Sequence, residues 1–164
     1  MSEAEGKNNY LGFGNPANDE FYLADYPFYL IDQINHRYGV EMETVLRKHK
    51  MERTQWQILL ILREKNPSSI SEISERSGKK LSTVSRVIER MRNDDLVSTA
   101  PRESDNRITD VLLKSAGKQA LGKVLKVASK QYERAISGFS EDEIRKIHLQ
   151  LQGILANLNR SPFE

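Results

Sequence analysis

Basic and hydroxyl side chains gather in two stretches of the sequence, and both suit the phosphates and base edges of a nucleic acid. The first stretch is KKLSTVSRVIER, residues 79–90. At 100° per residue its aliphatic side chains fall on one side of a helix, and its Ser, Thr and Arg side chains fall roughly opposite. Such a helix fits the major groove of DNA, where Arg86 could donate two hydrogen bonds to a guanine. The candidate DNA contacts here are Lys79, Lys80, Ser82, Thr83, Ser85, Arg86 and Arg90. A solvated helix face is the simpler alternative.

The second stretch, RESDNR at residues 102–107, separates the short apolar segments LVSTA and ITDVLL. Both segments are rich in β-branched residues and predict two paired strands joined by a charged turn. At the tip of such a hairpin, Arg107 would enter a minor groove, where negative potential favours arginine. Asp105 could hold that guanidinium extended through two hydrogen bonds. Arg102 and Ser104 would contact backbone phosphates. The alternative is a solvated turn with an incidental Asp–Arg pair.

Helix signals precede these stretches. Thr54 with Gln57 predicts a capping box that opens a short apolar helix. Ser69 with Glu72 repeats the pattern for the next helix, and Gly78 suits the left-handed end of that helix. The order helix, helix, glycine-containing turn, helix, strand, charged loop, strand is that of a winged helix-turn-helix, with residues 102–107 at the tip of the wing.

Three longer helices are predicted outside this unit. One of about five turns begins at Asp25 to Pro27 and has a possible weak point at Gly39. Ser115 is placed to cap a second, and the capping box SEDE at Ser140 opens a third. Their apolar faces exceed what one small domain can cover, which predicts a two-fold homodimer; packing as a bundle within one monomer is the alternative. Such a dimer would set two recognition helices about 34 Å apart on a palindromic operator.

Composition and charge limit the function classes. At 164 residues the chain fits one domain, and its longest apolar run covers residues 58–62. No secretory signal is visible, so we expect a cytoplasmic protein without membrane contact. Cysteine is absent, which excludes disulfides and thiolate zinc sites. Residues 1–35 carry six acids and one lysine, a local charge of −5 against +7 for the remainder. An acidic leader therefore precedes a basic body that could meet phosphate.

Catalysis is not expected. His36, His49 and His148 are far apart in the sequence, and no Ser-His-Asp order, carboxylate pair or nucleotide-binding glycine loop stands out. We therefore expect no catalytic residue and no cofactor. A metal-responsive regulator using His36, Glu41, Glu43 and His49 is an alternative, but their spacing is loose and we expect no metal site. A protein-interaction scaffold that keeps the winged helix without binding DNA is the other alternative.

The segments SISEISERSGKKLSTVSRVIERMRNDDLV and RESDNRITDVLLKSAGKQAL resemble the MarR family of winged helix-turn-helix transcription regulators. Asp105 and Arg107 match the family's Asp-x-Arg in the wing, and KSAGKQAL is similar to its usual entry into the fifth helix. Glu103 and Ser104 depart from the more basic wings of many members. The resemblance implies a mainly α fold with a small β-hairpin wing, flanked by N- and C-terminal dimerisation helices. It also implies a DNA-binding regulator, expected to be a repressor.

The predicted domains are a flexible acidic arm at 1–24, an N-terminal dimerisation helix at 25–50, the winged helix-turn-helix at 51–114 and C-terminal dimerisation helices at 115–164. Similar regulators usually respond to a ligand held between the dimer helices and the DNA-binding lobes. A small aromatic or phenolic acid is expected here, and a bulkier acyl thioester is possible. Aromatic walls with a few cationic groups suit such an effector. The candidate ligand contacts are Phe28, Tyr29, His36, Arg37, Trp56 and Tyr132. Packing in the core or interface is the alternative role for each.

Overall fold

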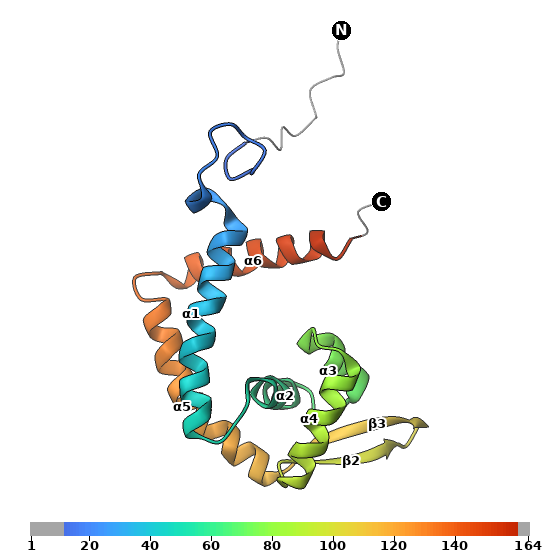
Figure 1. The fold of residues 1–164 in the computed structure, drawn as a ribbon. Coiled ribbons are helices and arrows are strands. Elements are labelled where there is room, and N and C mark those ends of the chain that lie inside the picture. Colours follow the sequence, from blue (N-terminus) through green and yellow to red (C-terminus); the bar gives the residue numbers. More distant parts are fainter. Residues whose placement is uncertain (1–11, 161–164) are drawn as a thin grey trace.

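The computed structural model describes residues 12–160 and is mainly helical, with one small antiparallel sheet, as predicted. Figure 1 shows α1 and α5 side by side on one flank, and α3, α4 and the β2–β3 hairpin on the other. In chain order the elements are η1 Leu23–Asp25, α1 Pro27–Lys48, α2 Arg53–Glu64, β1 Ser68–Ser69, α3 Ile70–Ser77, α4 Leu81–Asn93, β2 Val97–Arg102, β3 Asp105–Leu113, α5 Ser115–Ala135 and α6 Glu141–Leu158. No helix in the described part is long and apolar enough to cross a membrane.

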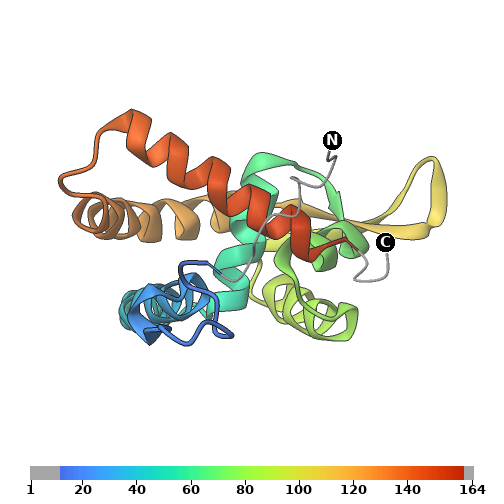
Figure 2. The ribbon, with the colours of Figure 1, turned by 90° about the horizontal axis from the view of Figure 1, so that it is seen from above.

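The sheet has the order β1-β3-β2, and its hairpin is longer than predicted. Arg102 still belongs to β2 and Asp105 already to β3, so the turn itself is two residues long. The register shifts between Pro101, which pairs with Thr109, and Arg102, which pairs with Asp105. Such an irregularity bends a hairpin and re-aims its side chains. Figure 2 shows the hairpin projecting well beyond α3 and α4.

Helix α2 lies at the centre of the core. Its Ile58, Leu59 and Leu62 side chains are fully buried. Met42 from α1 and Val124 from α5 are buried in the same apolar cluster. Because α2 packs against α1, α3, α4 and α5, it joins the two flanks of the molecule. A well-packed element of this kind transmits displacements rather than absorbing them.

The short helices begin partly where the sequence predicted. Ser69 and Glu72 form the predicted capping box of α3, and Gly78 ends that helix with φ of 63°, a conformation that favours glycine. For α2 the predicted capping pair was wrong. The helix begins at Arg53, and the Gln55 side chain accepts a hydrogen bond from the backbone N–H of Glu52 at 2.8 Å.

Two expectations for the long helices also need correction. Ser115 does not cap α5, because it is already the first helical residue and Lys114 occupies the cap position without a side-chain hydrogen bond. Gly39 is no weak point, since α1 runs through it without a break. A Cβ at Gly39 would lie 2.7 Å from an Nη atom of Arg53, so the missing side chain leaves room for this arginine. The Ser140 capping box of α6 is as predicted.

The first eleven residues of the predicted acidic arm lie outside the described residues. Residues 12–20 form successive turns and bends, with hydrogen bonds from the N–H of Asn15 to the carbonyl of Gly12 and from the N–H of Asn18 to that of Asn15. The 3-10 helix η1 follows at Leu23–Asp25. The ring of Tyr26 contacts those of Phe21 and Phe28 edge-on, with centroids 6.0 and 5.5 Å apart. This part of the arm therefore has local structure of its own.

Candidate nucleic-acid interface

Helix α4 separates an apolar face from a polar one. Val84, Val87, Ile88 and Met91 are buried against the core. Ser82, Thr83 and Arg86 are exposed, as is Lys80 at the helix start. Within residues 12–160 the Arg86 guanidinium has no side-chain partner, so it is free to bind an external group. Lys79 is half-buried, and the Ser85 hydroxyl donates to the carbonyl of Leu81 at 2.9 Å.

Near the tip of the wing, Asp105 holds the guanidinium of Arg107. The carboxylate of Asp105 accepts hydrogen bonds from the backbone N–H of Arg107 at 3.1 Å, from its Nε at 3.0 Å and from an Nη at 2.9 Å. These hydrogen bonds lower the pKa of Asp105 and raise that of Arg107. The Arg107 side chain is nevertheless 90% exposed. The two side-chain hydrogen bonds are the bidentate contact expected from the sequence, and contact with DNA stays a prediction.

A small cleft of about 220 Å³ lies between the wing and the helix-turn-helix. Its lining includes Arg107 and Thr109 from β3, Leu81 and Ser85 from α4, and Ser71 from α3. The polar face of α4 and the guanidinium of the wing therefore border one surface. Neighbouring donors of this kind could contact a duplex together, with α4 in a groove and the wing beside it.

Arg90 is held by the protein itself. Its two Nη atoms donate to the two carboxylate oxygens of Glu52, each at 2.8 Å. This side chain was predicted to contact DNA, and any such contact must compete with the carboxylate. Because both partners are about half exposed, exchange with another anion costs little.

Arg102 also points at the protein's own carboxylates. Its Nε donates to both oxygens of Asp110, at 3.2 and 3.1 Å, and an Nη donates to Oδ1 at 2.7 Å. The same Nη lies 3.6 Å from a carboxylate oxygen of Glu72. Ser104, by contrast, is exposed in the turn. The sequence predicted phosphate contacts for both residues, and the arrangement of Arg102 differs from that expectation.

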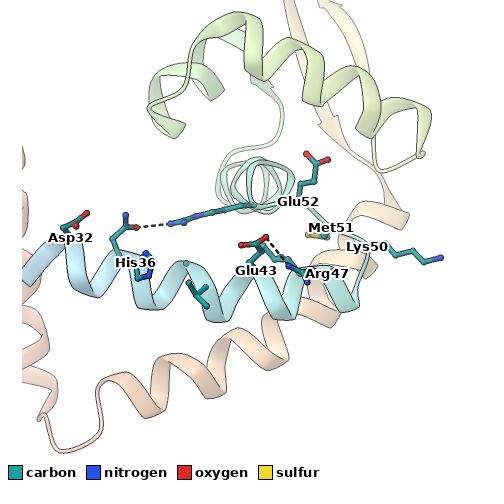
Figure 3. A pocket seen from close by; sticks show the side chains of 12 residues that line it. Asp32, His36, Glu43, Arg47, Lys50, Met51 and Glu52 are labelled. Carbon is teal, nitrogen blue, oxygen red and sulfur yellow. Dashed lines mark hydrogen bonds and ion pairs between the residues drawn. The ribbon is translucent and has the colours of Figure 1, made fainter.

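A cavity of about 750 Å³ lies between α1 and the start of α2 (Figure 3). Arg53 crosses it over Gly39 and donates to Oδ1 of Asn35 at 3.0 Å. Charged side chains of both signs border the space. The lining residues are Asp32, Asn35, His36, Gly39, Val40, Glu43, Leu46, Arg47, Lys50, Met51, Glu52 and Arg53.

Of the predicted ligand contacts, His36 borders this cavity. Arg37 and His36 both border a smaller pocket, of about 360 Å³, on α1. Trp56 is buried in the core, and Tyr132 is exposed on α5. Phe28 is exposed near the start of α1 and Tyr29 is half-buried beside it. The structure therefore does not bring these six residues together in one pocket of the described chain.

Sequence reasoning missed most of the cavity lining. One signal was present, because Asp32, His36, Gly39 and Glu43 are three or four residues apart and share one helix face. The contributions of Glu52 and Arg53 had no such signal, since they depend on how α2 packs on α1.

The residues considered for a metal do not converge. Glu41 accepts a hydrogen bond from Gln131 at 3.0 Å and pairs with Arg134, both on α5. Glu43, which lines the cavity, instead pairs with Arg47 at 3.3 Å. Among the described residues no group of three or more His, Cys, Asp or Glu side chains could hold a metal ion.

Comparison with known proteins shows the family to which the chain belongs. Residues 51–109 match the model of the MarR family. Over 144 residues the chain is 36% identical to the HTH-type transcriptional repressor IacR of Pseudomonas putida, covering 88% of this chain and 86% of that protein.

Solved structures share the fold. A MarR-family regulator from Silicibacter pomeroyi superposes with a TM-score of 0.78 at 22% identity, over 86% of this chain and 95% of that one. BpsR of Bordetella bronchiseptica, whose DNA binding is regulated by 6-hydroxynicotinic acid, has a TM-score of 0.71 at 19% identity, over 82% and 96%. PcaV of Streptomyces coelicolor, solved with its natural ligand, has the same TM-score at 17% identity, over 85% and 98%. From its winged helix and its similarity to IacR, we conclude that this chain belongs to the MarR family of DNA-binding transcriptional regulators, which are not enzymes.

Proposed function

We propose that the protein is a repressor that binds a palindromic operator as a homodimer and releases it when a small aromatic or phenolic acid, or its acyl thioester, binds. The observation that carries the DNA-binding part is the exposed guanidinium of Arg107, held by two side-chain hydrogen bonds to Asp105 beside the polar face of α4. An exposed arginine of this kind suits a narrow minor groove, where the negative potential is enhanced. The similarity to the repressor IacR supports the direction of regulation.

The homodimer is supported by apolar surface that this chain leaves uncovered. Helix α6 has no buried residue, although leucines and isoleucines recur along it. Further apolar side chains are exposed on α1 and α5. On α1, α5 and α6 together, the large apolar side chains that are exposed are Phe28, Leu30, Ile34, Tyr38, Val40, Val127, Tyr132, Ile147, Leu149, Leu151, Leu155 and Leu158. Exposed apolar side chains in such number are typical of an interface, and a two-fold axis would let both copies bury them.

Sedimentation tests the dimer. We expect a dimer at micromolar concentration, and we expect Leu151→Glu to shift the protein towards monomer because it places a charge in the apolar patch. Gln150→Glu adds the same charge at an exposed polar position of the same helix and should leave the dimer intact. A wild-type monomer would contradict the proposed homodimer.

The effector is expected in the cavity between α1 and α2. Its volume lies within the range of roughly 300–1,000 Å³ that is typical of small-molecule sites. Arg53 spans the cavity and uses one Nη on Asn35, so its remaining N–H groups could receive a ligand carboxylate. The 6-hydroxynicotinic acid that regulates BpsR is itself an aromatic carboxylic acid, which favours this ligand class here.

A panel of phenolic and aromatic acids, with 6-hydroxynicotinic acid included, tests the effector. We expect at least one compound to raise the melting temperature and to weaken DNA binding, and Arg53→Gln should reduce both effects. Arg63→Gln changes the same charge at the other end of α2, outside this cavity, and serves as the control. Equal responses of the two variants would contradict the assignment of Arg53. A panel without any effect would contradict the ligand class.

A further inference from the structure

The base of the wing contains a second arginine–carboxylate contact, between Arg102 and Asp110. Three hydrogen bonds of 2.7–3.2 Å join the two side chains. Asp110 is nearly buried, with 12% of its side chain exposed, whereas the Arg107 side chain at the tip is 90% exposed. The two arginines of the wing therefore face in different directions, one towards the protein and one towards solvent.

This contact crosses the irregular part of the hairpin. Asp110 pairs across the sheet with Ala100, and the regular register ends one residue further along β2, at Pro101. Beyond that point the strands no longer pair in the regular register, and residues 106–108 have no partner in the ladder. The guanidinium of Arg102 thus fastens the distal end of β2 to the regular part of β3. A hairpin is otherwise least constrained where its ladder is interrupted.

The same arginine connects the wing to the helix-turn-helix. Its Nη lies 3.6 Å from the Glu72 carboxylate. Glu72 accepts hydrogen bonds from the backbone N–H of Ser69 at 2.7 Å, as part of the α3 capping box, and from the Lys65 ammonium at 2.6 Å. The Lys65 and Ser69 hydrogen bonds lower the pKa of Glu72 to about 2, so the carboxylate stays charged near neutral pH. One network therefore joins the end of α2, the start of α3 and both strands of the wing.

We propose that Arg102 is a positioning residue. It fixes the wing relative to α3 and α4, so that Arg107 meets the duplex at a set distance from the recognition helix. A phosphate bound to Arg102 would have to approach two carboxylates, those of Asp110 and Glu72, and like charges in contact are unfavourable. The consequence for DNA rests on the proposed DNA binding, whereas the placement of the wing does not.

Distance measurement on the free protein tests the placement without DNA. Because the chain has no cysteine, spin labels can be attached at Glu75→Cys on α3 and Glu103→Cys at the wing tip. Because the proposed dimer would carry two labelled copies, the labelled protein is mixed with an excess of unlabelled protein. We then expect one narrow distribution for the distance between the two labels of a copy, and we expect it to broaden when Asp110→Asn or Arg102→Lys is added. Lysine keeps the charge but cannot make the forked contact with a carboxylate. An unchanged distribution in both variants would overturn the proposal.

DNA binding gives a second test in which the two roles predict opposite signs. If Arg102 contacted phosphate, Asp110→Asn would free it and strengthen binding. As a positioning residue it requires Asp110, so we expect Asp110→Asn and Arg102→Lys each to weaken binding, on the order of threefold to thirtyfold for members of one network. The slope of log affinity against log salt should stay at the wild-type value, because no phosphate contact is lost.

Glu141→Gln is the matched control for Asp110→Asn. It removes one negative charge from an exposed ion pair with Arg145 on α6 and should leave the affinity near that of wild type. The probe is a duplex enriched by the wild-type protein from a random library, with an unselected duplex alongside. Tighter binding by Asp110→Asn, or wild-type binding by Arg102→Lys with a shallower salt slope for Arg102→Ala, would overturn the positioning role.

Discussion

Glu52 and Arg90 face each other across α2 and α4, with two parallel hydrogen bonds of 2.8 Å between carboxylate and guanidinium. Glu52 stands at the start of α2 and also lines the cavity between α1 and α2. Arg90 lies on the helix that is expected to enter the major groove. The ion pair therefore connects the proposed effector cavity directly to the proposed recognition helix.

Breaking this pair should change DNA binding more than stability. Glu52→Gln should lower the free energy of unfolding by less than about 1 kcal/mol, because exposed ion pairs contribute little. The freed Arg90 could then take a phosphate, so we expect tighter binding to an unselected duplex and a salt slope steeper by about one. Urea unfolding measures the change in stability, and fluorescence anisotropy of a labelled duplex at several salt concentrations measures the change in DNA binding.

The control for Glu52→Gln is Glu64→Gln, which breaks the ion pair between Glu64 and Arg76 at the other end of α2. Both variants change the net charge equally. If their DNA affinities and salt slopes agree, Arg90 has no role at the duplex.

The wing arginine should respond to the DNA that flanks the operator. Arg107→Ala should weaken binding on the order of tenfold on A·T-rich flanks, the cost of one lost base-pair contact. The loss should be smaller on G·C-rich flanks, because the narrow minor groove of A-tracts concentrates negative potential. Asn106→Ala, at the neighbouring exposed position, is the control. Equal losses for Arg107→Ala on both flanks would exclude minor-groove insertion.

Local signals were predictable from the sequence. The capping boxes at Ser69 and Ser140 involve residues three apart, and their partners form them whatever the rest of the chain does. The same rule failed at α2 because two overlapping pairs satisfied similar patterns. The chain used the earlier one, with Glu52 and Gln55. Which of the two pairs caps α2 depends on where the turn before the helix ends, and no local sequence pattern specifies that position.

Contacts that depend on strand register or on the packing of helices could not be predicted from the sequence. Arg102 looked like a phosphate contact because its partner, Asp110, lies eight residues away, across a hairpin whose register shifts between them. Likewise, Trp56 was predicted to contact a ligand, but it lies on the buried face of α2 and is only 5% exposed. An indole or a guanidinium suits both roles, and tertiary placement decides between them.

Two glycines of α5 should respond oppositely to the same substitution. A Cβ at Gly117 would collide with the carbonyl oxygen of Leu96 and lie 2.7 Å from a methyl carbon of Leu113. Gly117→Ala should therefore lower the free energy of unfolding by about 1–3 kcal/mol. A Cβ at Gly122 meets nothing within 4 Å, so Gly122→Ala should raise it by up to about 1 kcal/mol through helix propensity. Urea unfolding measures the stability of the two variants. If Gly117→Ala and Gly122→Ala both destabilise the protein, this packing of α5 is contradicted.

Acid should destabilise the protein partly through Glu72. Its pKa is lowered from 4.5 to about 2, chiefly by the hydrogen bond from Lys65 and then by that from the Ser69 backbone. Because the folded value lies below the unfolded one, this contribution is complete above about pH 4.5 and is lost as the pH falls towards 2. Glu72→Gln should flatten stability over this window, whereas Glu75→Gln, at an exposed position of α3, should not. If the free energy of unfolding depends on pH in the same way for wild type and Glu72→Gln, the role assigned to the Glu72 carboxylate is contradicted.

Selection of bound duplexes from a random library, repeated with Arg86→Ala, tests the central claim most directly. We expect the wild type to enrich a palindrome whose half-site centres are about one helical turn apart, the spacing of two recognition helices in a two-fold dimer. Arg86→Ala should enrich the same palindrome with relaxed preference at one base pair in each half-site, at a cost of about 1–3 kcal/mol. Enrichment of no sequence by the wild type, or of a site without two-fold symmetry, would contradict the account.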